Sequence, residues 1–328
     1  MNRVALIFTG GTIGMTVTSS SEGAVPSLSA DDLVSTLKKA TGLENLESHE
    51  FSKLPSPHIT PGHMSSLKEK IDTCLKDDEY SGVVVVHGTD TLEETAFYLD
   101  AVNDSEKPIV VTGSMKNASE LGYDGLTNLA SSIKVASDPE SRKRGVLVVM
   151  HYEIHAACEV AKTHTLSLDT FKSIDFGPLG IIDEDEVLYY RSMAVRAGYN
   201  LANTFSEDVA LIRAYSGIKR DIIDFYINAG YKGLVLEALG RGNLPPSFAE
   251  GIKKARETGL EVVITSRAPS GRVLDSYGYE GGGKDLVRHG CILGGRLSGP
   301  KARLLLMLGL GNGLAHAGIK RLFHTSPS

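Results

Sequence analysis

Short runs of apolar, mostly β-branched residues recur along the first half of the chain. Four of them lie at residues 4–8, 82–88, 108–114 and 145–151. Their apolar residues are continuous rather than alternating, which is typical of strands buried on both faces of a parallel sheet. The pattern therefore predicts a parallel sheet with helices packed on each side.

The segments between these runs have helical periodicity and helix-boundary signals. Residues 29–42 begin with Ser29 as a predicted N-cap, have acidic residues in the first turn and end at Gly42. Residues 60–77 begin with Thr60 as N-cap, followed by a proline at the first helical position. This alternation of strands and helices predicts a doubly wound α/β domain with right-handed crossovers.

The pattern changes in the second half of the chain. Residues 160–175 and 184–192 alternate like the arms of antiparallel hairpins, and residues 196–208 have no strong periodicity. A βα pattern resumes at residue 209. We therefore expect an α/β protein of two doubly wound domains, a larger N-terminal one with a parallel sheet and a hairpin, and a smaller C-terminal one with a parallel sheet. The expected N-terminal domain, linker and C-terminal domain are residues 1–190, 191–208 and 209–328.

Composition narrows the range of partners. Of the 328 residues, 23% are charged, the formal net charge is −6, and no long basic run occurs. This argues against nucleic acid and against an anionic membrane as the main partner. The apolar runs are too short to cross a bilayer, and the N-terminus lacks the regions of a signal peptide. We expect a cytoplasmic protein.

The sequence offers no pattern typical of a metal or nucleotide site. The three cysteines are far apart and form no CxxC pair, so neither a disulfide framework nor a zinc site is expected. Cys74 and Cys158 are interpreted as core thiols. The glycine-rich stretch TGGTIG matches neither GxGxxG nor a phosphate loop. We therefore expect no metal and no cofactor.

Three predicted strands end in a glycine with a hydroxyl residue beside it. The stretches are Thr9–Thr12, His87–Asp90 and Thr112–Ser114. Ligands of open α/β sheets bind at the carboxyl ends of the strands, so these stretches are candidates for a site. From the residues alone, Thr12 is either a cap of the following turn or a nucleophile, and a threonine nucleophile needs a base. Asp90 and Lys162 have two interpretations as well, a helix-start acid and a surface lysine, or partners in proton transfer.

Two of these stretches resemble the signatures of a known family. TGGTIGM (9–15) and HGTDTLEETAFYL (87–99) are similar to the two signature motifs of the bacterial-type L-asparaginase family. Further segments fit the same family in order along nearly the whole chain. They are residues 54–61, 108–115, 124–133, 161–165 and 240–246.

The resemblance implies a reaction and its catalytic residues. The family hydrolyses the side-chain amide of L-asparagine to L-aspartate and ammonia through a covalent acyl-threonine intermediate, with no cofactor. Thr12 matches the threonine that attacks the amide carbon. Thr89 matches the second catalytic threonine, with Asp90 and Lys162 as its partners. The backbone N–H of Thr89 and ordered water would stabilise the oxyanion.

The resemblance also implies how a small amide substrate is bound. Ser56 matches the residue that holds the substrate α-carboxylate, and Asp90 would bind its α-ammonium group. Gly11 and Gly88 match substrate-contacting positions in the two motifs. Asn243 and Glu280 are the nearest matches to residues that a neighbouring subunit contributes, so a homodimer or homotetramer is expected.

Two positions depart from the family pattern. Ala24 stands where many members have a lid tyrosine that bonds the nucleophile, and Pro57 stands where many have a polar side chain for the substrate carboxylate. Ser20, Ser21 or water could supply the missing donor. Two alternatives therefore stay open beside asparagine hydrolysis: an amidohydrolase acting on another amide or a cyclic imide, and a catalytically impaired amino-acid-binding homologue.

Overall fold

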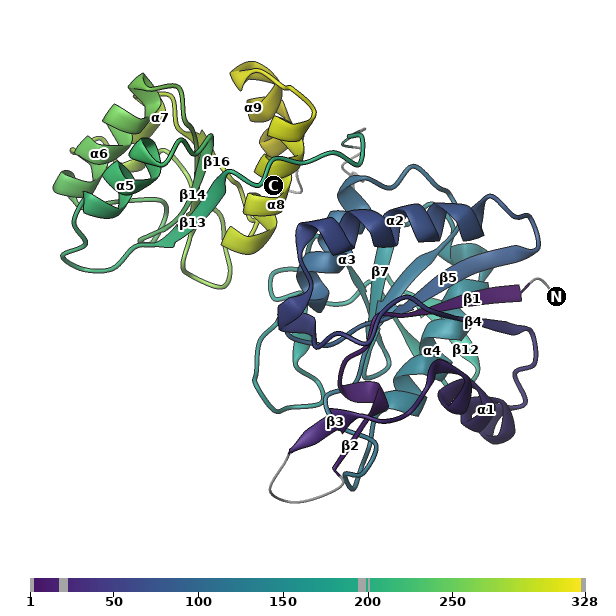
Figure 1. The fold of residues 1–328 in the computed structure, drawn as a ribbon. Coiled ribbons are helices and arrows are strands. Elements are labelled where there is room, and N and C mark those ends of the chain that lie inside the picture. Colours follow the sequence, from purple (N-terminus) through teal and green to yellow (C-terminus); the bar gives the residue numbers. More distant parts are fainter. Residues whose placement is uncertain (1–2, 18–22, 194–198, 200, 326–328) are drawn as a thin grey trace. The chain divides into compact units, whose positions relative to one another are not determined.

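The computed structural model describes residues 3–17, 23–193, 199 and 201–325. The chain divides into two compact units, Met1–Arg196 and Ala197–Ser328, which are described separately (Figure 1). The predicted linker lies partly outside the described residues, so its bounds stay a prediction.

The first unit is built on an eight-stranded mixed sheet. The five strands β4, β1, β5, β6 and β7 are parallel, whereas β8, β11 and β12 continue the sheet in antiparallel pairs. In spatial order the strands are β12 (Glu186–Tyr189), β11 (Gly180–Asp183), β8 (Glu153–Ala156), β7 (Val146–Met150), β6 (Ile109–Thr112), β5 (Tyr80–Val86), β1 (Arg3–Phe8) and β4 (Leu46–Glu50).

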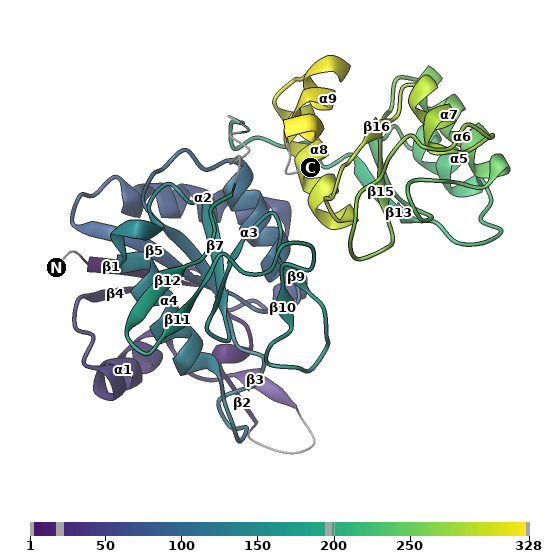
Figure 2. The same ribbon diagram turned by 180° about the vertical axis from the view of Figure 1, so that it is seen from behind.

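Helices cover both faces of this sheet (Figures 1 and 2). In β1, Val4, Leu6 and Phe8 belong to one core cluster and Ala5 and Ile7 to another, because successive strand side chains point to opposite faces. The first cluster includes side chains from two helices, and the second cluster includes side chains from another two. They are α1 (Ala30–Thr41) and α4 (Gly125–Ser137) on one face, and α2 (Pro61–Leu75) and α3 (Leu92–Ala101) on the other.

The predicted helix starts are confirmed. Ser29 caps α1 and accepts a hydrogen bond from the Asp32 backbone N–H, and Gly42 ends the helix in a left-handed conformation. Thr60 caps α2. The four predicted apolar strands are present, but the apolar pattern does not predict β4, because this half-buried edge strand is mostly polar (LESHE).

The chain reverses its direction across the sheet at β1. It passes from β1 to the edge strand β4 and then returns to β5 on the other side of β1. The carboxyl ends of β1 and β5 are therefore neighbours at the topological switch point, where ligands of such sheets bind.

Short antiparallel elements complete the first unit. Of the two predicted hairpin arms, residues 160–175 form a ribbon of β9 (Ala161–Lys162) and β10 (Phe171–Lys172), in which Lys162 pairs with Phe171. Residues 184–192 instead contain β12, which pairs antiparallel with β11 in the large sheet. Near the N-terminus, β2 (Met15–Val17) pairs with β3 (Ala24–Pro26). Three 3-10 helices are also described, η1 (Thr12–Gly14), η2 (Ser56–His58) and η3 (Pro139–Ser141).

The second unit has a four-stranded parallel sheet whose strands follow one another in chain order. The fold class is therefore the expected one, with a large N-terminal sheet and a smaller parallel C-terminal sheet. No helix in the described ranges is long and apolar enough to cross a membrane. The elements are β13 (Val209–Arg213), β14 (Gly233–Ala238), β15 (Glu261–Ser266), β16 (Ile292–Leu293), α5 (Asp221–Asn228), α6 (Pro246–Glu257), α7 (Gly283–Arg288), α8 (Gly299–Gly311) and α9 (His316–Thr325).

Candidate active site

The turns that follow β1 and β5 touch at two glycines. Gly11 has a φ of 93°, and a Cβ atom placed on it would lie 2.5 Å from the Cα of Gly88. A Cβ atom on Gly88 would lie 2.8 Å from the Cβ of Ser56. Only glycine allows backbones to approach this closely. The contact gathers Thr12, Ser56 and Thr89 around one point, because two of them adjoin these glycines in the chain.

Thr12 begins η1 at the carboxyl end of β1. Its side chain is half-buried. None of the described residues forms a hydrogen bond with its hydroxyl group. Thr12 is therefore available to an incoming group, and the capping role considered from the sequence is not the one it has here.

Thr89, Asp90 and Lys162 are in direct contact. The Lys162 Nζ donates to Thr89 Oγ1 at 3.0 Å and to Asp90 Oδ1 at 2.7 Å. The Lys162 side chain is only 18% exposed, whereas that of Asp90 is 61% exposed. The ammonium group thus links a buried hydroxyl to a carboxylate that faces outward. Lys162 is not a solvated surface lysine.

Ser56 is buried and connects η2 to the start of α3. Its Oγ accepts a hydrogen bond from the Asp90 backbone N–H at 3.2 Å, and its carbonyl accepts one from Thr91 Oγ1 at 2.8 Å. The hydroxyl oxygen acts as an acceptor toward Asp90, and none of the described residues accepts its proton, which is therefore available to a bound anion.

Glu93 is a member of this site that the sequence analysis missed. From the first turn of α3, its carboxylate accepts a hydrogen bond from the Lys162 backbone N–H at 2.5 Å. Acidic residues are common in first turns because they suit the helix dipole, so the sequence signal of Glu93 resembles an ordinary helix start. The contact joins β9 to α3.

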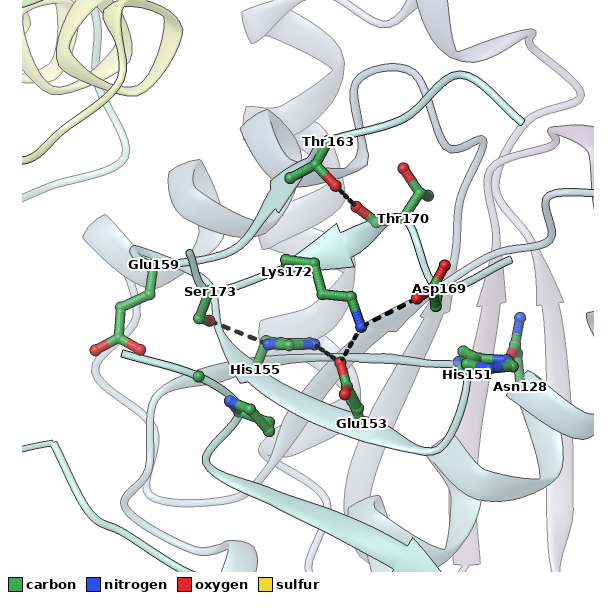
Figure 3. A network of polar contacts seen from close by, with 12 residues as sticks. Asn128, His151, Glu153, His155, Glu159, Thr163, Asp169, Thr170, Lys172 and Ser173 are labelled. Carbon is green, nitrogen blue, oxygen red and sulfur yellow. Dashed lines mark hydrogen bonds and ion pairs between the residues drawn. The ribbon is translucent and has the colours of Figure 1, made fainter. Parts of the chain in front are cut away.

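A partly buried polar network supports the other strand of the ribbon (Figure 3). Lys172 of β10 donates to the Glu153 carboxylate at 3.1 Å, and His155 Nδ1 lies 3.0 Å from Ser173 Oγ. His155 Nε2 lies 3.2 Å from Glu153, without hydrogen-bond alignment. His155 and then Lys172 lower the pKa of Glu153. Although serine, histidine and glutamate meet here, His155 has no exposed surface, so this imidazole cannot meet a substrate and the group serves to hold the ribbon.

The buried side chain of His87 supports the turn at Gly88. Its Nδ1–H donates to the Gly88 carbonyl at 2.7 Å, so its Nε2 accepts from the Thr95 hydroxyl at 3.0 Å. Complete burial lowers the pKa of His87 to about 4, from an ordinary 6.5. The imidazole is therefore neutral near pH 7 and serves as a fixed support.

Asn243 and Glu280 lie on adjacent loops of the second unit. The Asn243 Oδ1 accepts from the Gly283 backbone N–H at 3.4 Å, and Leu244 donates to the Gly281 carbonyl at 2.8 Å. Glu280 is exposed. The structure brings these two predicted residues near one another, but it does not relate them to the residues of the first unit.

The structure describes part of the predicted lid and its neighbours. Ser20 and Ser21 lie outside the described residues. Ala24 belongs to β3, and Pro57 lies exposed in η2 next to Ser56. Within the described ranges, no three His, Cys, Asp or Glu side chains gather in a way that could hold a metal ion.

Comparison with known proteins decides the family. Residues 3–195 match the family described as "Asparaginase, N-terminal", and residues 208–323 match the "Glutaminase/Asparaginase C-terminal domain". The chain belongs to the asparaginase family. The predicted resemblance and the prediction of an asparaginase-type amidohydrolase are confirmed.

Relatives within the asparaginase family span nearly the whole chain. An L-asparaginase of Bacillus licheniformis is 36% identical over 93% of this chain and 94% of its own length. A probable L-asparaginase of Deinococcus radiodurans is 38% identical over 98% of this chain and 97% of its own length. The crystal structure of a probable cytoplasmic L-asparaginase from Campylobacter jejuni superposes with a TM-score of 0.88 at 28% identity, covering 99% of both chains.

Proposed function

We propose that this asparaginase-family enzyme hydrolyses the side-chain amide of L-asparagine to L-aspartate and ammonia. The observation that carries the proposal is the contact of Lys162 with both Thr89 and Asp90, beside the turn that presents Thr12. Two relatives that match more than 90% of this chain are named as an L-asparaginase and a probable L-asparaginase, which supports L-asparagine as the substrate.

In the first step, the Thr12 hydroxyl oxygen attacks the amide carbon and its proton passes to the leaving nitrogen. The C–N bond breaks, ammonia departs, and an aspartyl ester forms on Thr12. Negative charge develops on the former carbonyl oxygen. The backbone N–H of Thr89 is suited to stabilise it, because no described residue accepts a hydrogen bond from that group. Such a donor contributes about 3–4 kcal/mol to transition-state stabilisation.

In the second step, water attacks the ester carbon, and the bond to Thr12 breaks. The water proton returns to Thr12 through the hydroxyl of Thr89. Lys162 keeps the Thr89 hydroxyl oriented, and Asp90 keeps the ammonium group of Lys162 in place. The products are L-aspartate and the regenerated threonine, so one water is consumed for each ammonia released.

The substrate's own charges supply its orientation. Ser56 donates its free hydroxyl proton to the α-carboxylate, and the exposed carboxylate of Asp90 binds the α-ammonium group, with Gly11 and Gly88 lining the site. We further propose that Asn243 and Glu280 of a second copy complete this site in a homodimer or homotetramer. A cytoplasmic location is part of the proposal, and the Campylobacter jejuni relative, described as a probable cytoplasmic L-asparaginase, supports it.

A second candidate is hydrolysis of another amide or a cyclic imide. Two proteins from Methanococcus maripaludis that are named as a subunit of glutamyl-tRNA(Gln) amidotransferase are 30% identical, over 95% and 89% of this chain. Pro57, exposed beside Ser56, offers no polar group to the substrate carboxylate. Both observations favour including amides other than L-asparagine in the test.

The deciding experiment measures ammonia release from L-asparagine, D-asparagine and L-glutamine. We expect turnover of L-asparagine by the natural protein and none by Thr12→Ala. Lys162→Met should lower kcat far more than it raises KM, because the lysine acts in the reaction and not in binding. Binding of L-asparagine without ammonia release would contradict the proposal and favour an amino-acid-binding homologue.

A further inference from the structure

The turn that carries Thr12 has little internal structure to hold it. Gly10 and Gly11 precede it with φ values of 113° and 93°, and glycine has more backbone freedom than any other residue. The helix η1 is three residues long. Since no described residue hydrogen-bonds to the Thr12 hydroxyl, the backbone position of the turn must aim it. Contacts from outside the turn therefore decide where the hydroxyl points.

One such contact comes from Tyr123, in the loop that precedes α4. The Tyr123 hydroxyl donates to the carbonyl oxygen of Ile13 at 2.8 Å. Ile13 directly follows Thr12. Among the described residues, Tyr123 is the only one whose side chain hydrogen-bonds to the backbone of residues 10–15.

Tyr123 is itself firmly placed. A Cβ atom on Gly125 would overlap the Tyr123 ring, so the ring lies directly over this glycine. The neighbouring Asp124 carboxylate accepts hydrogen bonds from the backbone N–H groups of Met115 and Lys116, each at 3.0 Å, which ties the loop to the segment after β6. Burial and then the charge of Asp124 raise the pKa of Tyr123, so the phenol keeps its proton and stays a donor.

We propose that Tyr123 is a positioning residue for Thr12. The Tyr123 hydroxyl holds the Ile13 carbonyl and thereby fixes Thr12, the proposed nucleophile, against the turn at Gly88. This inference rests on the proposed role of Thr12 in amide hydrolysis. Tyr123 touches no reacting atom. Its effect is expected on the rate of the chemical step, because small misplacements of a nucleophile are costly to rate.

The test compares Tyr123→Phe with a matched control. Tyr123→Phe removes one oxygen and keeps the ring over Gly125. We expect kcat for L-asparagine to fall about tenfold while KM stays within about twofold. Tyr189→Phe removes another half-buried phenol oxygen, one that is bonded to Ser141 Oγ at 2.6 Å, and should leave kcat unchanged. A purely structural role would lower thermal stability without lowering kcat per folded molecule.

Hydrogen exchange of the backbone amides of residues 9–17 gives a readout that needs no activity. The inference requires faster exchange of this segment in Tyr123→Phe, but not in Tyr189→Phe. If the natural enzyme is active and Tyr123→Phe has unchanged kcat, the inference is wrong and the proposed function stands. If the natural protein releases ammonia from no amide, the proposed function is wrong. Exchange then decides alone: faster exchange supports the hold of Tyr123 on the turn, and unchanged exchange refutes it.

Discussion

Three threonines at the ends of neighbouring strands differ mainly in what surrounds their hydroxyl groups. Thr112 Oγ1 donates to the Val149 carbonyl at 2.8 Å and is fully buried. Thr89 accepts from Lys162. The hydroxyl group of Thr12 has no hydrogen-bond partner among the described residues. The same side chain is thus a structural tie at Thr112, a member of a charged cluster at Thr89 and, in the reaction proposed above, the nucleophile at Thr12.

Glu93 gives a prediction at this scale. Glu93→Ala frees the Lys162 backbone N–H, so the lysine loses its alignment with Thr89, and kcat should fall about tenfold with little change in KM. Glu93→Gln keeps an oxygen that can accept this hydrogen bond and should retain most of the activity. Steady-state kinetics on L-asparagine measure both.

A neighbouring glutamate provides the control for charge. Glu94→Ala removes the same charge from the same turn of α3 and should leave kcat close to that of the natural enzyme. Equal losses in Glu93→Ala and Glu94→Ala would mean that charge, and not the bond to the Lys162 amide, is responsible.

At the scale of elements, the site depends on short segments tied to longer ones. The helix η2 carries Ser56 and is bonded to the start of α3. The ribbon of β9 and β10 carries Lys162 and is held by α3 on one side and by Glu153 on the other. Because α3 and its first residues hold both η2 and β9, the proposed substrate-binding serine and the proposed proton-transfer lysine share one support.

The tie between η2 and α3 can be weakened with a single substitution. Thr91→Val removes the hydroxyl that bonds the Ser56 carbonyl. A hydrogen bond of this kind contributes about 1 kcal/mol net, so KM for L-asparagine should rise about fivefold as Ser56 loses its position. We expect kcat to change less than KM. Thr36→Val, which removes a similar hydroxyl from α1, is the control, and a KM unchanged by Thr91→Val would contradict the expected role of this tie.

At the scale of the whole molecule, stability and the site are linked through His87. The imidazole supports the turn at Gly88 only from complete burial, in the neutral form. The pKa of His87 is about 4 in the folded protein, against an ordinary 6.5. As the pH falls below 6.5, His87 becomes protonated in the unfolded chain but stays neutral in the folded chain until the pH approaches 4. The free energy of unfolding of the first unit therefore decreases with falling pH.

This linkage has a measurable size. Between pH 7.5 and pH 5, the contribution of His87 to the free energy of unfolding should decrease by about 2 kcal/mol. Hydrogen exchange of the β1 and β5 amides reports opening of this unit. His87→Asn, which lacks the titrating ring, should lose about 2 kcal/mol less than the natural protein over the same interval. The same pH dependence in both proteins would show that His87 is not the group responsible.

The sequence by itself determined the parallel strands, the capped helices and the presence of a second, smaller sheet. Continuous β-branched runs and Ser, Thr, Pro and Gly at helix ends are local signals, because they act through interactions between residues that are close in the sequence. The motifs around Thr12 and Thr89 likewise indicated the family without coordinates. The polar edge strand β4 was not predictable, because its place depends on pairing with β1 and not on its own apolar residues.

The family resemblance implied that Lys162 and Asp90 are partners, but only the tertiary structure showed their contact and revealed the contacts of Glu93 and Tyr123. Lys162 is 72 residues from Asp90, and Tyr123 is 110 residues from Ile13. Contacts of this separation depend on where the switch in strand order brings the turns together. Glu93 and Tyr123 carry no local signal that separates them from an ordinary helix acid and a loop tyrosine, since their roles consist of a single long-range hydrogen bond. Folding aligns these groups, and the physical reason is that hydrogen bonds require a geometry that sequence spacing does not specify.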